Sequence, residues 1–122
     1  MKNMKVLVVD AESKNRETIK KMLFELNYSN VICCSNGFDA INISRLEKMD
    51  LIVMDLLPKE KLDGVETAKL IFTKAPIIFI SNTFSAEANE ELNALKKVSF
   101  VMKPITQISL KNAIENALGL CK

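Results

Sequence analysis

The sequence predicts an α/β protein of three layers, in which a doubly wound sheet of five parallel strands lies between helices. Two observations predict this class. Five apolar runs of the length of buried strands are spread along the chain, and the segments between them carry apolar residues at helical spacing. A regular alternation of strand and helix favours parallel βαβ units, in which each helix returns the chain to the same edge of the sheet.

The strands are the most clearly marked elements. Each is a short run of apolar, often β-branched residues bounded by polar or turn-forming residues, as expected of a strand that is buried on both faces. The predicted strands are Val6–Val9, Val31–Cys34, Leu51–Asp55, Ile77–Ser81 and Val98–Lys103.

The first two helices follow the first two strands. The segment Ser13–Leu26 is predicted to be a helix that ends at Asn27. Its apolar stripe at positions i, i+3, i+4 and i+7 consists of Ile19, Met22, Leu23 and Leu26. The second helix follows the turn pair Asn36-Gly37. Its inward-facing residues are expected to be Phe38, Ile41, Ile43 and Leu46.

Three further helices are predicted. One begins near Val65, stops before Pro76 and buries Val65, Ala68 and Phe72. The next has Ser85 as its N-cap and an apolar stripe of Ala88, Leu92 and Leu95. The last ends at Gly119 and is lined by Ile108, Ile114 and Leu118.

Composition narrows the class of protein further. A chain of 122 residues with 48% hydrophobic residues fits one domain, residues 1–122. The formal net charge of +2 is too close to balance to indicate nucleic acid or an anionic membrane as a partner, and no apolar run is long enough to span a bilayer. Three cysteines and no secretory leader favour a soluble, cytoplasmic protein with reduced thiols.

Cysteine and histidine usage also excludes several kinds of site. The chain has no histidine, which excludes catalysis by Ser-His and Cys-His pairs and most zinc sites. Cys33 and Cys34 are neighbours in a strand, so they are expected to point to opposite faces and cannot hold one metal ion together.

Four predicted strands end on polar residues that could do chemistry. These residues are Asp10, Asp55, Ser81 and Lys103. The carboxyl ends of parallel strands meet at one crevice, so the four side chains are expected to converge. An aspartate can act as a nucleophile, a second carboxylate can hold a divalent cation, and a hydroxyl and an ammonium can bind phosphoryl oxygens. The pattern therefore indicates phosphoryl transfer.

These residues resemble the response-regulator receiver domain of two-component signalling over nearly the whole chain. The motifs that carry the resemblance are Val6–Asp10, Leu51–Asp55, Asp63-Gly64, Ser81 and Lys103-Pro104. The resemblance implies the CheY-like sheet order 2-1-3-4-5 with five helices.

The resemblance also implies roles for individual residues. Asp55 is expected to be the phosphoacceptor, and Mg²⁺ to be held by Asp10, Asp55 and the backbone carbonyl of Leu57. Ser81 is expected to be the switch hydroxyl, Lys103 the amine, and Phe100 the switch aromatic. The protein would then catalyse its own phosphorylation and dephosphorylation and not be a turnover enzyme.

The same resemblance implies partners. The phosphoryl donor is expected to be a histidine kinase or a histidine phosphotransfer protein. Phosphorylation is expected to alter the face made by the fourth helix, the fifth strand and the fifth helix, which would bind a downstream protein or effector domain or form a dimer. Neither nucleic acid nor a membrane is expected to bind directly.

Three departures from the family pattern leave alternatives open. Ala11 stands where the family has a second metal-binding acid, and Glu12 is the next carboxylate that could serve. The loop 56–63 places Pro58 early, which makes the Leu57 ligand less secure, and Asn82 replaces the small residue beside the switch hydroxyl. A pseudo-receiver that works without phosphorylation is therefore an alternative.

Two other protein classes remain as alternatives. Asp10-Ala11-Glu12 faintly resembles the start of haloacid-dehalogenase-type phosphatases, in which Asp10 would be the nucleophile, although the carboxylates and cap of that class are missing. A flavodoxin-like nucleotide binder is disfavoured because the loop after the first strand has no glycine.

Overall fold

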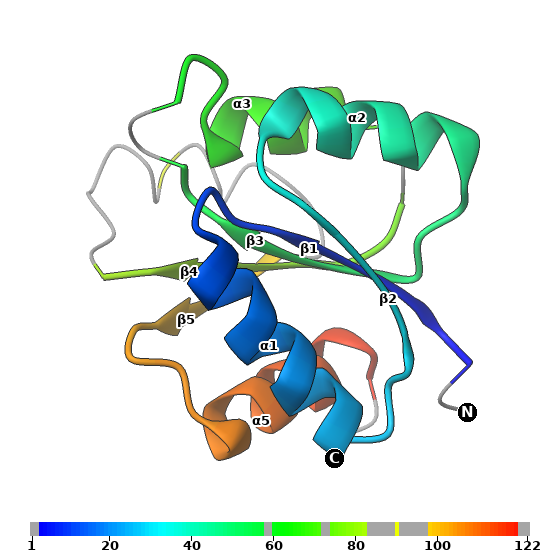
Figure 1. The fold of residues 1–122 in the computed structure, drawn as a ribbon, viewed down its shortest axis with the longest axis vertical. Helices are drawn as coiled ribbons and strands as arrows, with labels where there is room; N and C mark the ends of the chain where they lie inside the picture. The colour runs from blue at the N-terminus through cyan, green and yellow to red at the C-terminus, as the bar shows by residue number, and fades with distance from the viewer. Residues whose placement is uncertain (1–2, 58–59, 72–73, 83–89, 91–97, 120–122) are drawn as a thin grey trace.

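The part of the chain that the structure describes has three layers, with one parallel sheet between two pairs of helices. The computed structural model describes residues 3–57, 60–71, 74–82, 90 and 98–119. Helices α2 and α3 lie on one side of the sheet and helices α1 and α5 on the other (Figure 1). The predicted fold class is confirmed.

The sheet has the strand order β2-β1-β3-β4-β5, and all its neighbouring strands are parallel. Its strands are β1 (Lys5–Val9), β2 (Asn30–Cys34), β3 (Leu51–Asp55), β4 (Ile77–Ser81) and β5 (Val98–Met102). All five predicted strands are confirmed to within one residue at each end. The order 2-1-3-4-5 expected from the family resemblance is confirmed as well.

The strands separate two hydrophobic cores. Alternate residues of a strand point to opposite faces, so Val6 and Val8 enter the first core, against α1 and α5, whereas Leu7 and Val9 enter the second, against α2 and α3. All four of these side chains are at most 1% exposed. The central position of β1 and β3 therefore holds their carboxyl ends between two packed layers.

Four helices lie within the described residues, and their caps explain where they begin and end. They are α1 (Ser13–Glu25), α2 (Gly37–Leu46), α3 (Gly64–Leu70) and α5 (Gln107–Ala117). Asn36 and Asp63 are N-caps whose side chains accept hydrogen bonds from backbone N–H groups three residues on. Asn27 and Gly119 follow the C-caps of α1 and α5 with φ values of 73° and 71°, so the predicted stops are confirmed.

The prediction that three helix side chains face inward is wrong. Phe38 and Leu46 of α2 are 59% and 84% exposed, and Ile108 of α5 is 71% exposed. Helix α2 instead buries small residues, which are Gly37, Ala40 and Ser44. Helix α5 buries Leu110, Ala113 and Ile114, a stripe that lies on another face than Ile108. The small residue Gly37 lets α2 lie close to Thr67 of α3. Hydropathy alone does not reveal which small residues make such contacts.

Some predicted features lie outside the described residues. They include the helix capped by Ser85 with Ala88, Leu92 and Leu95, and also Pro58, Phe72 and Cys121.

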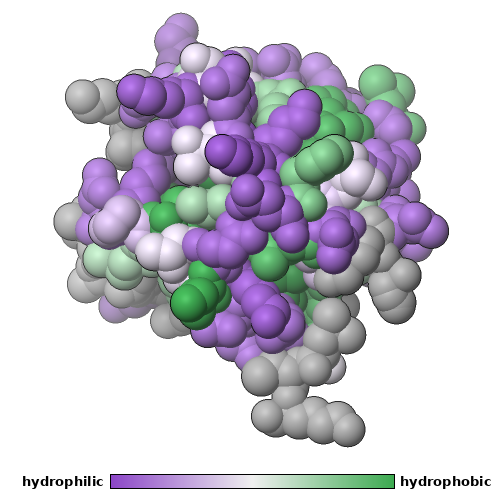
Figure 2. Space-filling model, turned by 60° about the horizontal axis from the view of Figure 1, so that its bottom comes forward, coloured by the Kyte–Doolittle hydropathy of each residue, from purple (hydrophilic) through white to green (hydrophobic). Residues whose placement is uncertain are grey.

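Among the residues that the structure does describe, no helix has the length and apolar character needed to cross a membrane. Figure 2 shows the side where α1 and α5 lie, and in its coloured part hydrophilic residues predominate while hydrophobic residues form separate small patches.

The two described cysteines are free and face opposite cores, as predicted. Cys33 packs against the first core and Cys34 belongs to the second. Burial raises the pKa of both thiols, that of Cys34 to about 11. Both therefore stay protonated and unreactive at neutral pH.

Candidate phosphoryl-transfer site

The predicted site residues meet at the carboxyl edge of the sheet, on the left of Figure 1. Val9 of β1 pairs with Met54 of β3, so the next residues along these strands, Asp10 and Asp55, are neighbours. On the other side of β3, Asp55 pairs with Ile80, which places Ser81 one residue beyond it. The parallel register thus sets two carboxylates and a hydroxyl-bearing residue side by side.

The Asp55 carboxylate has a partner on each oxygen. Its Oδ1 accepts a hydrogen bond from Lys103 Nζ at 3.0 Å, and its Oδ2 accepts one from the backbone N–H of Leu57 at 2.8 Å. The side chains of Lys103 and Asp55 are 24% and 13% exposed, so their ion pair is partly shielded from water. These two contacts fix the orientation of the carboxylate.

The loop after Asp55 depends on two unusual backbone positions. Leu57 has φ 51°, a left-handed conformation that costs a non-glycine residue about 1–2 kcal/mol. Its side chain is 1% exposed in the second core, and this burial offsets the cost. The Leu57 carbonyl accepts a hydrogen bond from the backbone N–H of Glu60 at 3.1 Å and keeps a second lone pair for another partner.

Gly64 closes the same loop. A Cβ atom at Gly64 would lie 2.7 Å from the Asp55 carbonyl oxygen and 2.8 Å from Leu56 Cα, which are both backbone atoms. The Gly64 N–H also donates to the Leu56 carbonyl. Only glycine allows α3 to begin this close to the end of β3, which gives the Asp63-Gly64 pair its structural role.

Asp10 is buried with one unpaired oxygen. The residue is 2% exposed. Its Oδ1 accepts hydrogen bonds from the Glu12 backbone N–H at 2.9 Å and from Asn15 Nδ2 at 3.4 Å, whereas its Oδ2 has no partner. Burial raises the pKa of the Asp10 carboxyl and the nearby Asp55 charge raises it further, against the lowering effects of the Glu12 N–H, Lys103 and Asn15. A buried carboxylate oxygen without a partner suits a bound cation.

We expect Asp10→Asn to stabilise the fold at neutral pH in the absence of divalent cations. Because the folded pKa of Asp10 is raised, its contribution to stability is present below the unfolded pKa and is lost as pH rises through the folded pKa. The asparagine amide does not ionise, so the variant avoids this loss of stability. We expect its free energy of unfolding to exceed that of the wild type by on the order of 1 kcal/mol at neutral pH. Urea denaturation with a chelator at a series of pH values measures the difference. A variant that is less stable than wild type at neutral pH contradicts this account.

Ser81 and Lys103 lie at the adjacent carboxyl ends of β4 and β5, whereas Phe100 lies in the middle of β5. The Lys103 backbone N–H donates to the Ser81 carbonyl at 2.8 Å, and Lys103-Pro104 is a cis peptide. The Phe100 ring is stacked against the buried Phe79 ring with centroids 6.4 Å apart, and Phe100 remains 37% exposed. Ser81 therefore lies beside Asp55, whereas Phe100 lies two residues before the end of β5.

A pocket of about 390 Å³ opens beside the carboxylates. Its lining comes from the carboxyl ends of β1, β4 and β5 and from the first turns of α1: Asp10, Asn15, Thr18, Ile19, Ile80, Asn82, Lys103, Pro104 and Ile105. The sequence singled out Asp10, Asn82 and Lys103 but missed Asn15, whose only signal is its place in the first turn of a helix that follows Asp10. It also missed Arg16, which donates to the Asp10 carbonyl at 2.7 Å.

The described residues offer a cation only a small number of carboxylate ligands. They contain no group of three acidic, cysteine or histidine side chains that could hold a metal ion. Glu12 is the exposed N-cap residue of α1, and its backbone N–H, not its carboxylate, is in contact with Asp10. Asp10 and Asp55 are thus the two carboxylates that the structure brings together.

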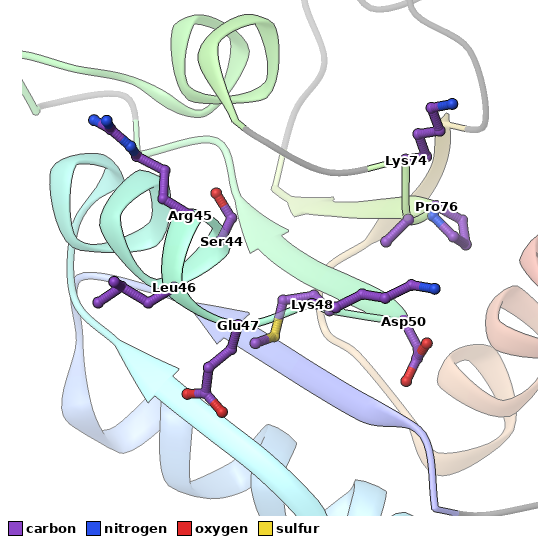
Figure 3. A pocket seen from close by; sticks show the side chains of 10 residues that line it. Ser44, Arg45, Leu46, Glu47, Lys48, Asp50, Lys74 and Pro76 are labelled. Atoms are coloured by element: carbon purple, nitrogen blue, oxygen red, sulfur yellow. The ribbon is translucent and has the colours of Figure 1, made fainter.

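A second pocket, of about 550 Å³, lies at the opposite edge of the sheet. It is lined by Ser44 to Asp50 and by Lys74 to Pro76, and Figure 3 shows its charged side chains. Lys5 lies next to it, where Lys5 Nζ pairs with Glu47 at 2.9 Å and the Lys5 backbone N–H donates to Asp50 at 2.8 Å. None of the predicted site residues lines this pocket, so it is separate from the pocket beside Asp10.

Comparison with known families shows which family the chain belongs to. The sequence model of the response regulator receiver domain matches residues 6–115. The chain belongs to this family. Receiver domains act in two-component signalling and are generally not turnover enzymes, which agrees with the family resemblance found in the sequence.

The chain is similar to curated proteins of chemotaxis and of transcriptional regulation. The chemotaxis protein CheY homolog of Campylobacter jejuni is 30% identical over 124 residues, which cover 95% of the chain and 93% of that protein. The transcriptional regulatory proteins YvrH of Bacillus subtilis and PdtaR of Mycobacterium tuberculosis are each 29% identical, with 47% and 57% of their lengths covered. The chain spans about half the length of these two regulators.

Solved receiver structures share the fold. Chemotaxis protein CheY4 of Vibrio cholerae superposes with a TM-score of 0.84 at 22% identity, over 93% of the chain and 98% of that protein. The receiver domain of the sensor histidine kinase PA1611 of Pseudomonas aeruginosa, which has a magnesium ion in its active site cleft, gives a TM-score of 0.81 at 24% identity. It covers 96% of the chain and 98% of that domain. At these identities the likeness shows the fold alone.

Proposed function

We propose that residues 1–122 form a single receiver domain that is phosphorylated on Asp55. A carboxylate oxygen of Asp55 attacks the phosphorus of a phosphohistidine, the bond from phosphorus to the imidazole nitrogen breaks, and the released imidazole takes up a proton. The product is an acyl phosphate that later hydrolyses. The observation that carries this proposal is the Lys103–Asp55 contact of 3.0 Å beside the buried Asp10.

Asp55 is a better nucleophile candidate than Asp10. Asp55 lies at the cleft edge with Lys103 Nζ on one oxygen, which can follow the transferred phosphoryl group. Asp10 is more deeply buried, and burial raises its pKa. This difference favours the receiver mechanism over a phosphatase that uses Asp10.

Magnesium would be held by Asp10, Asp55 and the Leu57 carbonyl. Hard oxygen ligands of this kind suit Mg²⁺, and the unpaired Asp10 Oδ2 is a ready ligand atom. Bound Mg²⁺ would offset the negative charge on the phosphoryl oxygens. The magnesium-bound receiver of PA1611 supports a cation at this edge of the fold, and Glu12 stays a further predicted ligand.

Phosphorylation would act as a charge switch. It adds roughly 1.5 to 2 negative charges beside Lys103 and Ser81, which are drawn toward the phosphoryl oxygens. Movement of the β4 end then gives the half-exposed Phe100 ring room to turn inward. The altered surface around β5 and α5 would bind a downstream protein or effector domain, or a second phosphorylated copy. The donor would be a histidine kinase or a histidine phosphotransfer protein.

Intact mass spectrometry after incubation with acetyl phosphate and Mg²⁺ tests the proposal. We expect addition of one phosphoryl group that hydroxylamine removes, as an acyl phosphate requires, and that peptide mapping places on Asp55. Addition at another residue would overturn the assignment. Failure to add the group at tens of millimolar acetyl phosphate and Mg²⁺ would favour the pseudo-receiver, which the missing acid at Ala11 already makes a second candidate.

We expect Ala11→Asp to tighten Mg²⁺ binding by about tenfold or more, because each added carboxylate raises the attraction for a divalent cation. Position 11 directly follows Asp10 and is exposed, so the new side chain meets no core packing. Mg²⁺ titration followed by amide NMR measures the dissociation constant. Ala11→Asn is the matched control of equal size without the charge. Equal affinities of the wild type and Ala11→Asp would show that position 11 does not face the cation.

A further inference from the structure

The cation site proposed above lacks one side-chain oxygen compared with its family. Asp10 supplies a buried Oδ2 without a partner, and Asp55 supplies a carboxylate at the cleft edge. Ala11 supplies nothing. Another oxygen-bearing side chain of this chain that lies beside Asp10 could replace the missing ligand.

Asn15 lies in that place. It belongs to the first turn of α1, is half-buried, and lines the 390 Å³ pocket together with Asp10 and Lys103. Its Nδ2 donates to Asp10 Oδ1 at 3.4 Å, which is at the long end of hydrogen-bond distances. The contact is therefore weak enough to be exchanged for a better one.

The Asn15 amide can present either end to Asp10. Rotation about its terminal torsion exchanges the NH₂ group and the oxygen at nearly the same position. The NH₂ group faces Asp10 when no cation is present, because two oxygens at this distance would repel each other. A divalent cation held by Asp10 beside the Asn15 amide reverses the preference, and the amide oxygen then becomes a hard ligand.

Other polar side chains around the pocket fit this role less well. The Glu12 side chain is exposed and does not line the pocket. The Thr18 hydroxyl donates to the Lys14 carbonyl at 3.0 Å. Asn82 lines the pocket from the end of β4, and no contact between it and Asp10 is seen among the described residues, whereas Asn15 contacts Asp10 directly.

We propose that the Asn15 side-chain oxygen ligates the divalent cation held by Asp10 and Asp55, in place of the carboxylate that is absent at position 11. This inference rests on the proposed function, because it assumes the cation site. It makes the site one with two carboxylates and one neutral amide, which favours weaker binding than a three-carboxylate site.

Mn²⁺ titration of the full chain, followed by the EPR signal of the free ion, tests the proposal without phosphorylation. Asn15→Leu, which keeps the size and removes the oxygen, is expected to weaken binding at least about tenfold. Thr18→Val, in the same helix and pocket, is expected to leave the affinity unchanged. Circular dichroism shows whether each variant is folded. If Asn15→Leu does not fold, Asn15→Asp takes its place as the test, and it is expected to bind Mn²⁺ more tightly than the wild type.

The outcomes separate this proposal from the proposed function. Asp10→Asn should abolish Mn²⁺ binding in either case. If Asn15→Leu binds Mn²⁺ as tightly as the wild type while Asp10→Asn does not bind it, the Asn15 assignment is overturned and the receiver site proposed above still stands. Weakening by Asn82→Leu in place of Asn15→Leu overturns it as well. Absence of Mn²⁺ binding in the wild type removes both this ligand and the metal part of the proposed function, while the acetyl phosphate assay still tests Asp55.

Thermal denaturation gives a second readout. Asn15→Asp places a negative charge beside Asp10, so with a chelator its melting temperature should fall below that of the wild type. Mg²⁺ should then raise the melting temperature of Asn15→Asp more than that of the wild type, because a tighter ligand stabilises the folded state more. An equal Mg²⁺ effect in the two proteins would contradict the proposal.

Discussion

Asp55→Asn is expected to abolish phosphorylation and every structural response that depends on it. The amide nitrogen and oxygen of asparagine are not effective nucleophiles toward phosphorus, so the acyl phosphate cannot form. The variant should still fold, because the asparagine oxygen can accept the Leu57 N–H that Asp55 Oδ2 now accepts at 2.8 Å. Lys103 loses its anionic partner, and a stability change of 1 kcal/mol or less is about what a partly exposed pair contributes.

Amide NMR with beryllofluoride and Mg²⁺ measures this response. In the wild type we expect shifts near Ser81 and Phe100, and in Asp55→Asn none. Asp50→Asn is the matched control, because Asp50 lies at the opposite edge of the sheet in the pocket of Figure 3 and accepts a hydrogen bond from the Lys5 backbone. Shifts at Ser81 that persist in Asp55→Asn would exclude Asp55 as the phosphoacceptor.

Gly64→Ala is expected to destabilise the fold by about 1–3 kcal/mol, which is the usual cost of forcing an extra carbon into a packed site. The new Cβ would meet backbone atoms of Asp55 and Leu56 at 2.7 and 2.8 Å, and backbone cannot rotate away as a side chain can. The displaced loop carries the Leu57 N–H, so the rate of Asp55 phosphorylation should fall as well.

The sign of the Gly64 effect distinguishes this clash from helix propensity. Gly64 is the first residue of α3, where propensity alone predicts that alanine stabilises by up to about 1 kcal/mol. Ser13→Ala is the control at the same position of α1, where the residue is exposed. Urea denaturation of the two variants gives the comparison, and a Gly64→Ala protein more stable than the wild type would contradict the close approach seen here.

The strands were the elements that sequence could predict best. The runs Leu51–Asp55 and Ile77–Ser81 match β3 and β4 residue for residue. A strand covered by helices on both faces must be apolar throughout, so its ends are marked by the first polar residue. The same marks predicted Asp10, Asp55, Ser81 and Lys103, because a strand that ends on a polar residue also places it at the cleft.

Helix faces were harder to predict. Phe38, Leu46 and Ile108 are large and apolar, yet all three are exposed. The buried residues of α2 are glycine, alanine and serine, and a Cβ atom at Gly37 would clash with Thr67 of α3. The Ser44 hydroxyl is accommodated because it donates to the Ile41 carbonyl of its own helix. Close approach of backbones is decided by geometry that hydropathy does not encode.

The finer features of the site also depend on geometry. The sequence indicates a remodelled loop after Asp55 but not that Leu57 takes a left-handed conformation, which glycine usually takes. The contact between Asn15 and Asp10 spans a strand end and a helix turn, so neither residue reveals it alone. Such contacts depend on where α1 starts relative to β1.

The Lys103–Asp55 ion pair has a consequence for the encounter with a donor. In the proposed function the incoming phosphoryl group is anionic, and the carboxylates of Asp55 at the cleft edge and of the buried Asp10 would repel it electrostatically. The ammonium 3.0 Å from Asp55 offsets one of those charges before any cation arrives. We therefore expect the ion pair to lower the electrostatic barrier to the approach of a phosphoryl donor, and this effect should shrink as salt screens the charges.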